Sequence, residues 1–585
     1  MSGRRICIAG GHIVDQTRDE VGDLWIKDGR IIAPPGVDCG GVPPGANSII
    51  APPGVDHGDA SVQTSMHDAV HNDTTVIDAS GCLVLPGAID LHTHIGGGKL
   101  SIARMLMQPD PDRDRYLPVA PEVSRRYAQM GYTTCFEPAV LPSNAAAAHF
   151  EMSLIDAVDT GGYVVLGNEE PLLAMIADDV DDAVIDAYVT EHVDAAAAIA
   201  VKVVNPGGID AFKFNRRELN VDQKHPKYDV TPGQIVRRLA AAVRRIGLAH
   251  PLHVHASNLG VPGNIESTLA TVAAADGLPL HLTHVQFHSY GRRDSGMSSA
   301  AARLSECVNA NPQLTIDVGQ VMFGQTVTLS ADTMHQHANL IHASPKRGMI
   351  VDVDCQSGCG VVPFRYRDSH FVHALQWAIG LEIFLMVEDS ARVFLTTDHP
   401  NGGPMTSYPH LMRLLGDRSF RDDALSAIDP GAAAASSLRG IDRQYELRDL
   451  VATTRGGPAD ALGLADRGHL RPGARADVAV YDRNATIDAT FQDARLVLRQ
   501  GGIVHDRDGA YGDLPKPPRK TILAADLGRR VDDSVHCDHQ ATVDQYHRRF
   551  DVPPPRSRRV SRAAFEAMNV NTTGMDGCPV ESSAR

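Results

Sequence analysis

The chain has 585 residues, of which 43% are hydrophobic, 22% charged and 5% aromatic. This length exceeds one ordinary domain and accommodates a barrel of about 250 residues together with a smaller module. The formal net charge of −16 argues against a general nucleic-acid binder or membrane-surface binder. No apolar run approaches the roughly 18–20 residues of a membrane span, and the N-terminus lacks the apolar core of a secretory signal, so we expect a cytoplasmic protein.

Nine cysteines are scattered along the chain, and none forms a C-x-x-C pair. The odd number and low density argue against a disulfide framework and against an iron–sulfur cluster bound by neighbouring cysteines. Cys355 and Cys359 are the closest pair, and nothing near them in the sequence completes a tetrahedral metal site.

The two ends of the chain have the apolar pattern of short β-strands. Residues 1–85 contain several such runs, with Asp28-Gly29 as a hairpin turn. They also contain a Pro/Gly-rich insertion at 31–58, in which IIAPPGVDCG recurs almost unchanged as IIAPPGVDHG. The β-type pattern returns at 461–514, and we expect both segments to form one small β-domain. The Pro- and Arg-rich tail at 515–585 is predicted to be extended or partly disordered.

Residues 86–460 alternate short apolar runs with Ala-, Arg- and Glu-rich helical stretches. Strands separated by helices over such a length form parallel β/α units. The predicted fold class is therefore α/β, with a (β/α)8 TIM-like barrel at 86–460 and a small composite β-domain from the N- and C-terminal segments.

His92 and His94 form an H-x-H pair in the apolar run at 83–95. If this run is a barrel strand, residues i and i+2 point to the same face, and both imidazoles lie near the carboxyl end of the strand. Active sites of such barrels assemble at that end. An isolated H-x-H also occurs as two ordinary histidines, so its meaning depends on the rest of the chain.

Four later apolar runs each end in a further candidate metal ligand. In chain order these residues are Lys202, His255, His284 and Asp398. His253 shares a strand face with His255 but lies one layer deeper, whereas the odd separation of His281 from His284 predicts that His281 points to the opposite face. Imidazole and carboxylate donors at successive strand ends are typical of a two-zinc site with an open position for water.

Lys202 and Asp398 need chemical roles that differ from those of the imidazoles. An ammonium group has only donors, so Lys202 bridges two metals only after carbon dioxide converts it to a carbamate. The alternative for Lys202 is an ordinary ion pair with a carboxylate. Asp398 would orient the attacking water, accept its proton and pass it to the leaving nitrogen. The set therefore predicts hydrolysis of a carbon–nitrogen amide bond.

Several longer strings are specific enough to compare with known families. They are YAQMGYTT (127–134), VKVVNPGG (201–208), HASNLGVPGN (255–264), THVQFHSYG (283–291), IDVGQVMFG (316–324), SGCGVVPF (357–364), QWAIGLEIFL (376–385) and TTDHPNGGPMTSYP (396–409). They resemble the amidohydrolase superfamily. Within it they resemble the family of formylmethanofuran dehydrogenase A subunits, which includes the corresponding subunit of bacterial formyltransferase/hydrolase complexes.

The resemblance implies two zinc ions bridged by an N6-carboxylysine at Lys202, with the other five candidates as ligands. It implies reversible hydrolysis of N-formylmethanofuran to formate and methanofuran, within a multi-subunit complex of one-carbon metabolism. Arg293, with Arg292 beside it, matches a family arginine that would hold formate or the oxyanion. Neither an iron–sulfur cluster nor molybdopterin is expected in this chain, so redox chemistry would lie in partner subunits.

The segment that follows Lys202 contains four candidate substrate-binding residues. Asn205 opens the loop 205–208, and the following run contains Lys213, Arg216 and Arg217. Methanofuran has carboxylates, so the three cations would form a basic rim for its tail. The alternative is that they form an ordinary solvated face.

Two other functions remain open on this pattern. A free-standing hydrolase of cyclic amides, of the hydantoinase or dihydroorotase kind, would use the same metal ligands. A non-catalytic scaffold subunit would keep the fold without the metals. The strings at 283–291 and 396–409 argue against the first, and the presence of every expected ligand type argues against the second.

Overall fold

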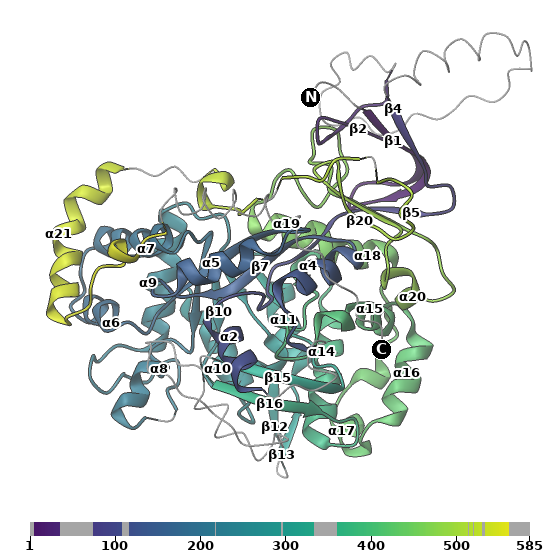
Figure 1. Cartoon of the computed structure of the whole chain (residues 1–585). Coiled ribbons are helices and arrows are strands. Elements are labelled where there is room, and N and C mark those ends of the chain that lie inside the picture. The colour runs from purple at the N-terminus through teal and green to yellow at the C-terminus, as the bar shows by residue number, and fades with distance from the viewer. Residues whose placement is uncertain are drawn as a thin grey trace, which may run out of the picture.

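The computed structural model describes residues 5–35, 74–107, 116–216, 218–293, 296–330, 332, 360–512, 514–518, 520–528 and 533–560. Two large sheets organise these residues into a barrel and a smaller β-domain, which Figure 1 shows at the upper right beside the N-terminus. None of the helices in these ranges is long and apolar enough to cross a membrane.

The larger unit contains eight parallel strands in the order β17-β14-β11-β10-β9-β8-β7-β6. They are β6 (Ala88–Asp90), β7 (Tyr132–Val140), β8 (Asp159–Leu166), β9 (Ala200–Val204), β10 (Leu252–His255), β11 (Leu280–Leu282), β14 (Leu314–Asp317) and β17 (Val393–Phe394). Residues that follow the two end strands meet: Thr396 Oγ1 donates to the His92 carbonyl at 2.7 Å, and His94 N donates to the His399 carbonyl at 2.8 Å. The predicted (β/α)8 barrel is confirmed.

Helices connect the strands and surround the barrel (Figure 1). Those between β6 and β17 are α2 (Gly98–Leu106), α4 (Ala120–Gln129), α5 (Ala145–Ser153), α6 (Glu170–Ala177), α7 (Asp182–Ala195), α8 (Gly208–Ala211), α9 (Pro232–Arg245), α10 (Ile265–Ala274), α11 (Ala301–Ala310) and α14 (Phe371–Met386). Those after β17 are α15 (Tyr408–Gly416), α16 (Arg418–Ala427), α17 (Pro430–Ala434), α18 (Leu447–Val451), α19 (Gly457–Leu462) and α20 (Ile487–Phe491). Local sequence explains such helices: Thr231 and Gln234 form a capping box at the start of α9, with Pro232 in its first turn.

The second sheet joins the two ends of the chain. Its order is β20-β19-β18-β5-β1-β2-β3, with β4 paired to β1. The strands are β1 (Arg5–Val14), β2 (Asp19–Lys27), β3 (Arg30–Ile32), β4 (Thr74–Asp78), β5 (Leu83–Pro86), β18 (Val478–Tyr481), β19 (Leu496–Arg499) and β20 (Gly502–Asp506). Asp28 (φ 50°) and Gly29 (φ 75°) form the predicted turn between β2 and β3. The composite β-domain is confirmed, while residues 36–58 of the insertion lie outside the described residues.

The run at 83–95 crosses from one sheet to the other, so the prediction that it forms one barrel strand is wrong. β5 pairs with β18 in the small sheet, whereas β6 pairs with β7 in the barrel. Gly87 lies between the two strands, where a Cβ atom would collide with the side chain of Thr133. A glycine at this position lets β7 pack directly against the crossing chain.

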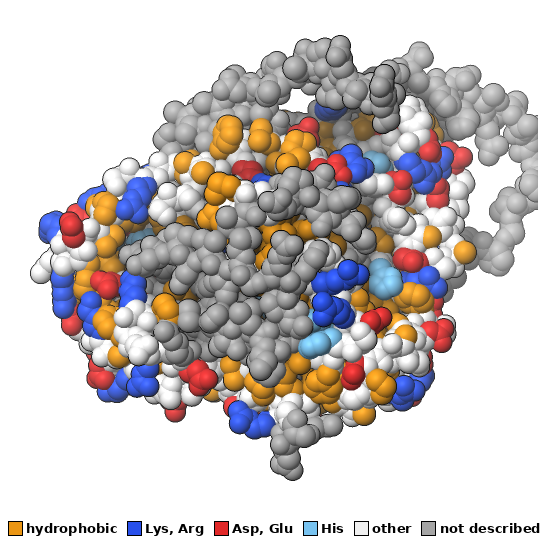
Figure 2. Space-filling view, turned by 60° about the horizontal axis from the view of Figure 1, so that its bottom comes forward, with side chains coloured by type: hydrophobic (Ala, Val, Ile, Leu, Met, Phe, Trp, Pro, Cys, Tyr) orange, Lys and Arg blue, Asp and Glu red, His pale blue; other side chains and the backbone are white. Residues whose placement is uncertain are grey.

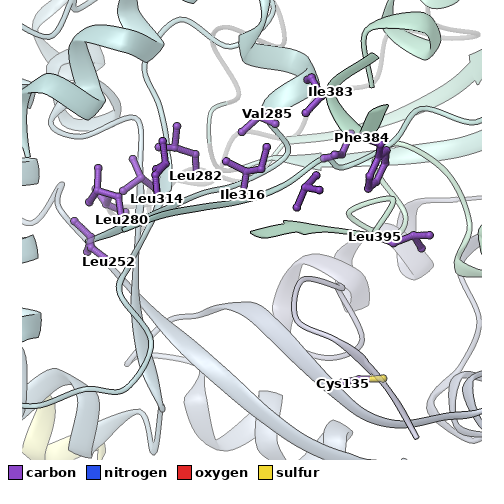
Figure 3. Close-up of a cluster of buried hydrophobic side chains, with 14 of the residues drawn as sticks. Cys135, Leu252, Leu280, Leu282, Val285, Leu314, Ile316, Ile383, Phe384 and Leu395 are labelled. Atoms are coloured by element: carbon purple, nitrogen blue, oxygen red, sulfur yellow. The ribbon is translucent and has the colours of Figure 1, made fainter. Parts of the chain in front are cut away.

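Side chains alternate between the two faces of the barrel strands. Leu280 and Leu282 of β11 pack with Leu314 and Ile316 of β14 in the main hydrophobic cluster, together with Ile383 of helix α14 (Figure 3). Through these contacts the helical layer packs against the outside of the barrel. The residues between them on the strands therefore point inward, toward the barrel interior.

A buried ionic network connects the small domain to the barrel. Asp159, the first residue of β8, contacts Arg467 and Arg475 at 2.7 Å and Arg499 at 2.9 Å. Asp477 contacts the first two arginines from the small domain, at 3.4 and 3.2 Å. All five side chains are buried. Since a buried charge is costly without its partner, this network makes the position of one unit depend on the other.

Asp159→Ala is expected to lower the free energy of unfolding by about 3–5 kcal/mol, because it removes the ion pair of the buried Arg499 and leaves Arg467 and Arg475 with Asp477. Denaturant titration of the variant and the wild type measures the difference. Asp442→Ala is the matched control, because Asp442 is 85% exposed in its ion pair with Arg418 and such pairs contribute at most about 1 kcal/mol. Equal losses in the two variants would contradict the network's role.

The C-terminal tail differs in part from its prediction as an extended or partly disordered segment. Helix α21 (Asp533–Arg549) packs on α7, with His547 stacked against Tyr188 and His192 at centroid distances of 5.7 and 6.0 Å. Val543 is fully buried in this contact. The prediction is therefore wrong for 533–549, and residues 561–585 lie outside the described residues.

Candidate metal centre and its pocket

The barrel brings together the six candidate ligands that the sequence analysis selected. His92 and His94 follow β6, Lys202 lies in β9, His255 ends β10, His284 follows β11 and Asp398 follows β17. Each of these residues is at most 5% exposed. Five of the six thus come from the carboxyl ends of their strands, as expected for parallel strands of one barrel.

Asp398 lies between the two histidines of the H-x-H pair. Its Oδ1 atom is 3.0 Å from His92 Nε2 and 3.4 Å from His94 Nε2. Its other oxygen accepts a hydrogen bond from Asn401 Nδ2 at 2.9 Å, which fixes the orientation of the carboxylate. Burial by itself raises the pKa of Asp398, but the neighbouring His92 and other cationic groups lower it overall.

Lys202 reaches the same cluster from β9. Its Nζ atom is 3.3 Å from His92 Nε2, and burial lowers the pKa of the ammonium group to about 8. His255 and His284 also line the pocket, with their ring centroids 4.5 Å apart, and the His284 ring lies 5.7 Å from that of His92. His288 is a neighbour that the sequence analysis did not select: the ring nitrogens of these three histidines include a set within 4.8 Å of one another.

The prediction that His281 points away from the site is wrong. His281 is buried inside the barrel, stacked on His253 at 4.5 Å, and its Nε2 lies 3.0 Å from Asp317 Oδ2. The parity argument fails because β11 ends at Leu282 and His284 has a left-handed backbone with φ 37°. The turn brings His284 to the site even though its separation from the inward-facing His281 is odd. His253 lies in the deeper layer, as predicted, with Nε2 3.0 Å from His92 Nδ1.

The donor set fits a divalent cation. Asp398 Oδ1 is buried and makes no hydrogen bond within the described residues, although the Nε2 atoms of His92 and His94 lie close to it. His284 Nδ1 is likewise buried without a hydrogen bond within the described part of the chain. Buried polar atoms without partners are costly unless a ligand or ion satisfies them. Imidazole nitrogens and carboxylate oxygens are ligands that zinc prefers.

Two buried carboxylates beneath the site were missed from the sequence. Glu137, within β7, accepts a hydrogen bond from His94 Nδ1 at 2.8 Å. Asp317, at the end of β14, lies 3.1 Å from His92 Nδ1 and accepts the backbone N–H of His284 at 2.7 Å. Nothing in the sequence around Glu137 distinguishes it. Asp317 does end an apolar run, LTID, which is the property that selected Asp398.

A cavity opens at the cluster, and its lining includes His94, Lys202, His255, His284 and Asp398. Its apolar wall comes from Phe287 and from the hairpin of β15 (Gly324–Ser330) and β16 (Gly360–Tyr366), which adds Phe364 and Tyr366. Polar groups at the same cavity are Lys99, Thr328, Ser330, Gln376 and Asn401. On the face turned forward in Figure 2, acidic, basic and apolar side chains are interspersed rather than separated by sign.

Three of the four candidates for substrate binding are described by the structure, and none of these three lines the cavity. Asn205 is buried and donates from Nδ2 to Asp332 Oδ1 at 3.2 Å. Lys213 is exposed and pairs with Asp210 at 3.1 Å. Arg216 is exposed, and the described residues that line the cavity include none of these three. Arg217 lies outside the described residues, as does the side chain of Arg293 at the end of strand β12 (Tyr290–Arg293).

The chain is similar in sequence to two known proteins and in structure to a chain of a solved complex. The chain is 40% identical over 512 residues to the A subunit of the formyltransferase/hydrolase complex Fhc of Methylorubrum extorquens, covering 84% of this chain and 87% of that protein. It is 35% identical over 469 residues to protein FwdA of Methanocaldococcus jannaschii, covering 75% and 82% respectively. It also matches a chain of the crystal structure of the formyltransferase/hydrolase complex (FhcABCD) from Methylorubrum extorquens with methylofuran, at 37% identity and a TM-score of 0.80, over 96% and 97% of the two chains.

The amidohydrolase family matches residues 75–505, which span the whole barrel and most of the strands of the small domain. This match includes all six candidate ligands. The described histidine and aspartate clusters are of the kind that binds metal. The chain therefore belongs to the amidohydrolase family.

Proposed function

We propose that this chain hydrolyses N-formylmethanofuran to formate and methanofuran at a binuclear zinc centre, as the hydrolytic subunit of a multi-subunit complex of one-carbon metabolism. The observation that supports this most directly is the convergence of His92, His94 and Asp398 with Lys202 in a buried cluster beside the pocket. The relative with 40% identity belongs to a formyltransferase/hydrolase complex, which supports the choice of a formyl amide.

The chain's own residues would hold both zinc ions. The ligands are His92, His94, Lys202, His255, His284 and Asp398, with Lys202 as the bridging N6-carboxylysine. When bound, the two ions would lower the pKa of water so that it attacks at neutral pH and would polarise the formyl carbonyl. The family and the buried imidazole and carboxylate donors support a metal site.

Asp398 would move the proton. Asn401 holds one carboxylate oxygen, which leaves Oδ1 directed toward the imidazoles of His92 and His94. As water adds to the formyl carbon, Oδ1 takes one proton and then delivers it to the nitrogen while the carbon–nitrogen bond breaks. The products are formate, the free amine and one proton that is released to solvent, so no oxidant or reductant is needed.

The pocket would bind the aromatic part of the substrate. Phe287, Phe364 and Tyr366 form an apolar wall of the cavity in which the formamide would lie, and such rings stack favourably on other aromatic rings. Arg293 would hold formate or the oxyanion, as the family resemblance implies. Lys213 and Arg216 lie away from the cavity lining, so their proposed role is limited to the distal, carboxylate-bearing tail.

The partners would be the other subunits of such a complex. The matching crystal structure is of the complex FhcABCD with methylofuran. Coverage of 96% of this chain and 97% of that chain means that the two chains have nearly the same extent. Redox cofactors, where a complex of this kind has them, would belong to other chains.

The test is formate release from N-formylmethanofuran by the chain purified with its co-expressed partner subunits. We expect about two zinc ions per chain, loss of turnover after treatment with a strong chelator, and recovery when zinc is added back. Fewer than about one zinc per chain with no turnover would instead indicate a non-catalytic scaffold.

Assays with cyclic amides distinguish the proposed function from the remaining alternative. A free-standing hydrolase of cyclic amides would cleave hydantoin or dihydroorotate with the same metals. We expect neither to be hydrolysed, because the relative with 40% identity belongs to a formyltransferase/hydrolase complex. Efficient cleavage of either ring, with no formate from N-formylmethanofuran, would overturn the proposed substrate.

A further inference from the structure

Glu137 is a buried carboxylate in the middle of a barrel strand, where an apolar residue would ordinarily lie. The residue is 1% exposed, and its side chain accepts four hydrogen bonds. Oε1 accepts from His94 Nδ1 at 2.8 Å and from Ala139 N at 3.2 Å. Oε2 accepts from Ile95 N at 2.8 Å and from Gly96 N at 3.1 Å. A carboxylate this deep in a protein is stable only when paired and hydrogen-bonded, so its contacts define its role.

These contacts determine which nitrogen of His94 has the proton. Both oxygens of Glu137 accept backbone N–H groups, which can only donate, and such hydrogen bonds favour the ionised carboxylate. An ionised carboxylate only accepts hydrogen bonds. The proton of neutral His94 is therefore on Nδ1. The lone pair is then on Nε2, which faces Asp398 Oδ1 at 3.4 Å.

The same carboxylate also holds the chain that follows His94. Ile95 and Gly96 donate both their N–H groups to Oε2, which fixes the start of the loop leading to α2. One side chain thus sets the backbone position and the ring orientation of His94 together. Asp317 makes a similar contact with His92, but there His253 Nε2 also lies 3.0 Å from the same nitrogen.

We propose that Glu137 is a positioning residue of the metal centre, which fixes the Nδ1-protonated tautomer of His94 so that Nε2 is available as a metal ligand. This inference rests on the proposed function, because it assigns a role toward the proposed zinc ions. Glu137 touches neither the substrate nor the metal. It acts through His94, as carboxylates beneath metal-binding histidines do in general.

Glu137→Gln tests this role with almost no change in size. The glutamine amide has one acceptor and one donor group, whereas all four partners of Glu137 are donors. Its oxygen is expected to face Ile95 and Gly96, because their peptide N–H groups can only donate hydrogen bonds. Its NH₂ group then faces His94 Nδ1, which becomes the acceptor, and the proton moves to Nε2.

We expect Glu137→Gln to bind zinc about 10–100-fold more weakly than the wild type. Competition with a chromophoric chelator measures the affinity, and thermal unfolding of the metal-free proteins measures stability separately. A purely structural role would lower the melting temperature but leave the zinc affinity of the folded protein unchanged. Unchanged affinity would overturn the proposal.

Glu382→Gln is the matched control. Glu382 is also a fully buried glutamate that accepts hydrogen bonds from a backbone N–H, that of Ser437, and from a side chain, that of Ser299. It does not line the cavity within the described residues. We expect this variant to keep wild-type zinc affinity, although its melting temperature falls.

A second measurement uses only the wild type, in case Glu137→Gln does not fold. In a crystal structure of the zinc-loaded complex, we expect zinc about 2.0–2.1 Å from His94 Nε2, with Nδ1 still hydrogen-bonded to Glu137. Zinc on Nδ1 would overturn the inference. Wild-type protein without zinc or turnover would overturn the proposed function instead, so the two failures are distinguishable.

Discussion

Replacing Asp398 with asparagine is expected to abolish nearly all hydrolysis of N-formylmethanofuran while the zinc content stays near that of the wild type. Asparagine keeps an oxygen that can contact a metal, but it cannot accept the proton of the attacking water. A general base contributes about 10²–10⁴-fold to a rate, and we expect a loss in kcat of about 10³-fold or more, because the same group also protonates the leaving nitrogen. Formate release and metal analysis on the same preparation measure both quantities.

The control for this variant is Asp15→Asn. Asp15 is equally buried, but it accepts backbone hydrogen bonds from Thr17, Arg18 and Leu470 in the small domain, far from the pocket lining. We expect it to lose stability but keep its kcat. Near-wild-type turnover by Asp398→Asn would show that another group moves the proton. Loss of zinc from that variant would show that the metal needs the charge of Asp398.

The candidate site was predictable because a parallel barrel has a simple geometry. All strands of the barrel run in one direction, so residues that end successive strands meet at one rim even when they are far apart in the sequence. His92 and Asp398 are 306 positions apart, yet their side chains lie 3.0 Å from each other. Residue type and place at the end of an apolar run were therefore enough to select both.

The supporting groups were not predictable by the same logic. Glu137 lies inside β7 rather than at its end, and its pairing with His94 depends on how the loop after β6 bends back over the strand. His281 was assigned to the wrong face because strand parity assumes an unbroken strand. The left-handed turn at His284 breaks that assumption, and no local pattern in LHLTH reveals it.

Pairing between distant parts of the chain also limited how much of the fold could be predicted from the sequence. The apolar run at 83–95 looks continuous in the sequence, but its two halves belong to different sheets because β5 finds its partner in β18, almost 400 residues later. Helix α21 was also not predicted, because it depends on contacts with a distant part of the chain. Its sequence has little apolar periodicity, and it folds against α7 through a few residues such as Val543 and His547.

Lys202 is the proposed ligand whose chemistry would depart furthest from that of an ordinary lysine. It is 3% exposed, and its Nζ lies 3.3 Å from an imidazole nitrogen of His92. An ammonium group here would be buried among proposed metal ligands and would repel the ions they hold. Addition of its neutral amine to carbon dioxide forms a nitrogen–carbon bond and releases one proton, which gives an anion with two acceptor oxygens.

Lys202→Ala is therefore expected to bind zinc at least about 100-fold more weakly and to lose turnover with it. A short carboxylic acid such as acetate fits the space left by the side chain and supplies two oxygens, so it is expected to restore part of both. His284→Ala also removes a proposed ligand, but acetate is not expected to rescue it, because a carboxylate does not replace an imidazole there. Full zinc occupancy of Lys202→Ala without any added acid would rule out the carbamate bridge, because no carboxylate would then be needed between the metals.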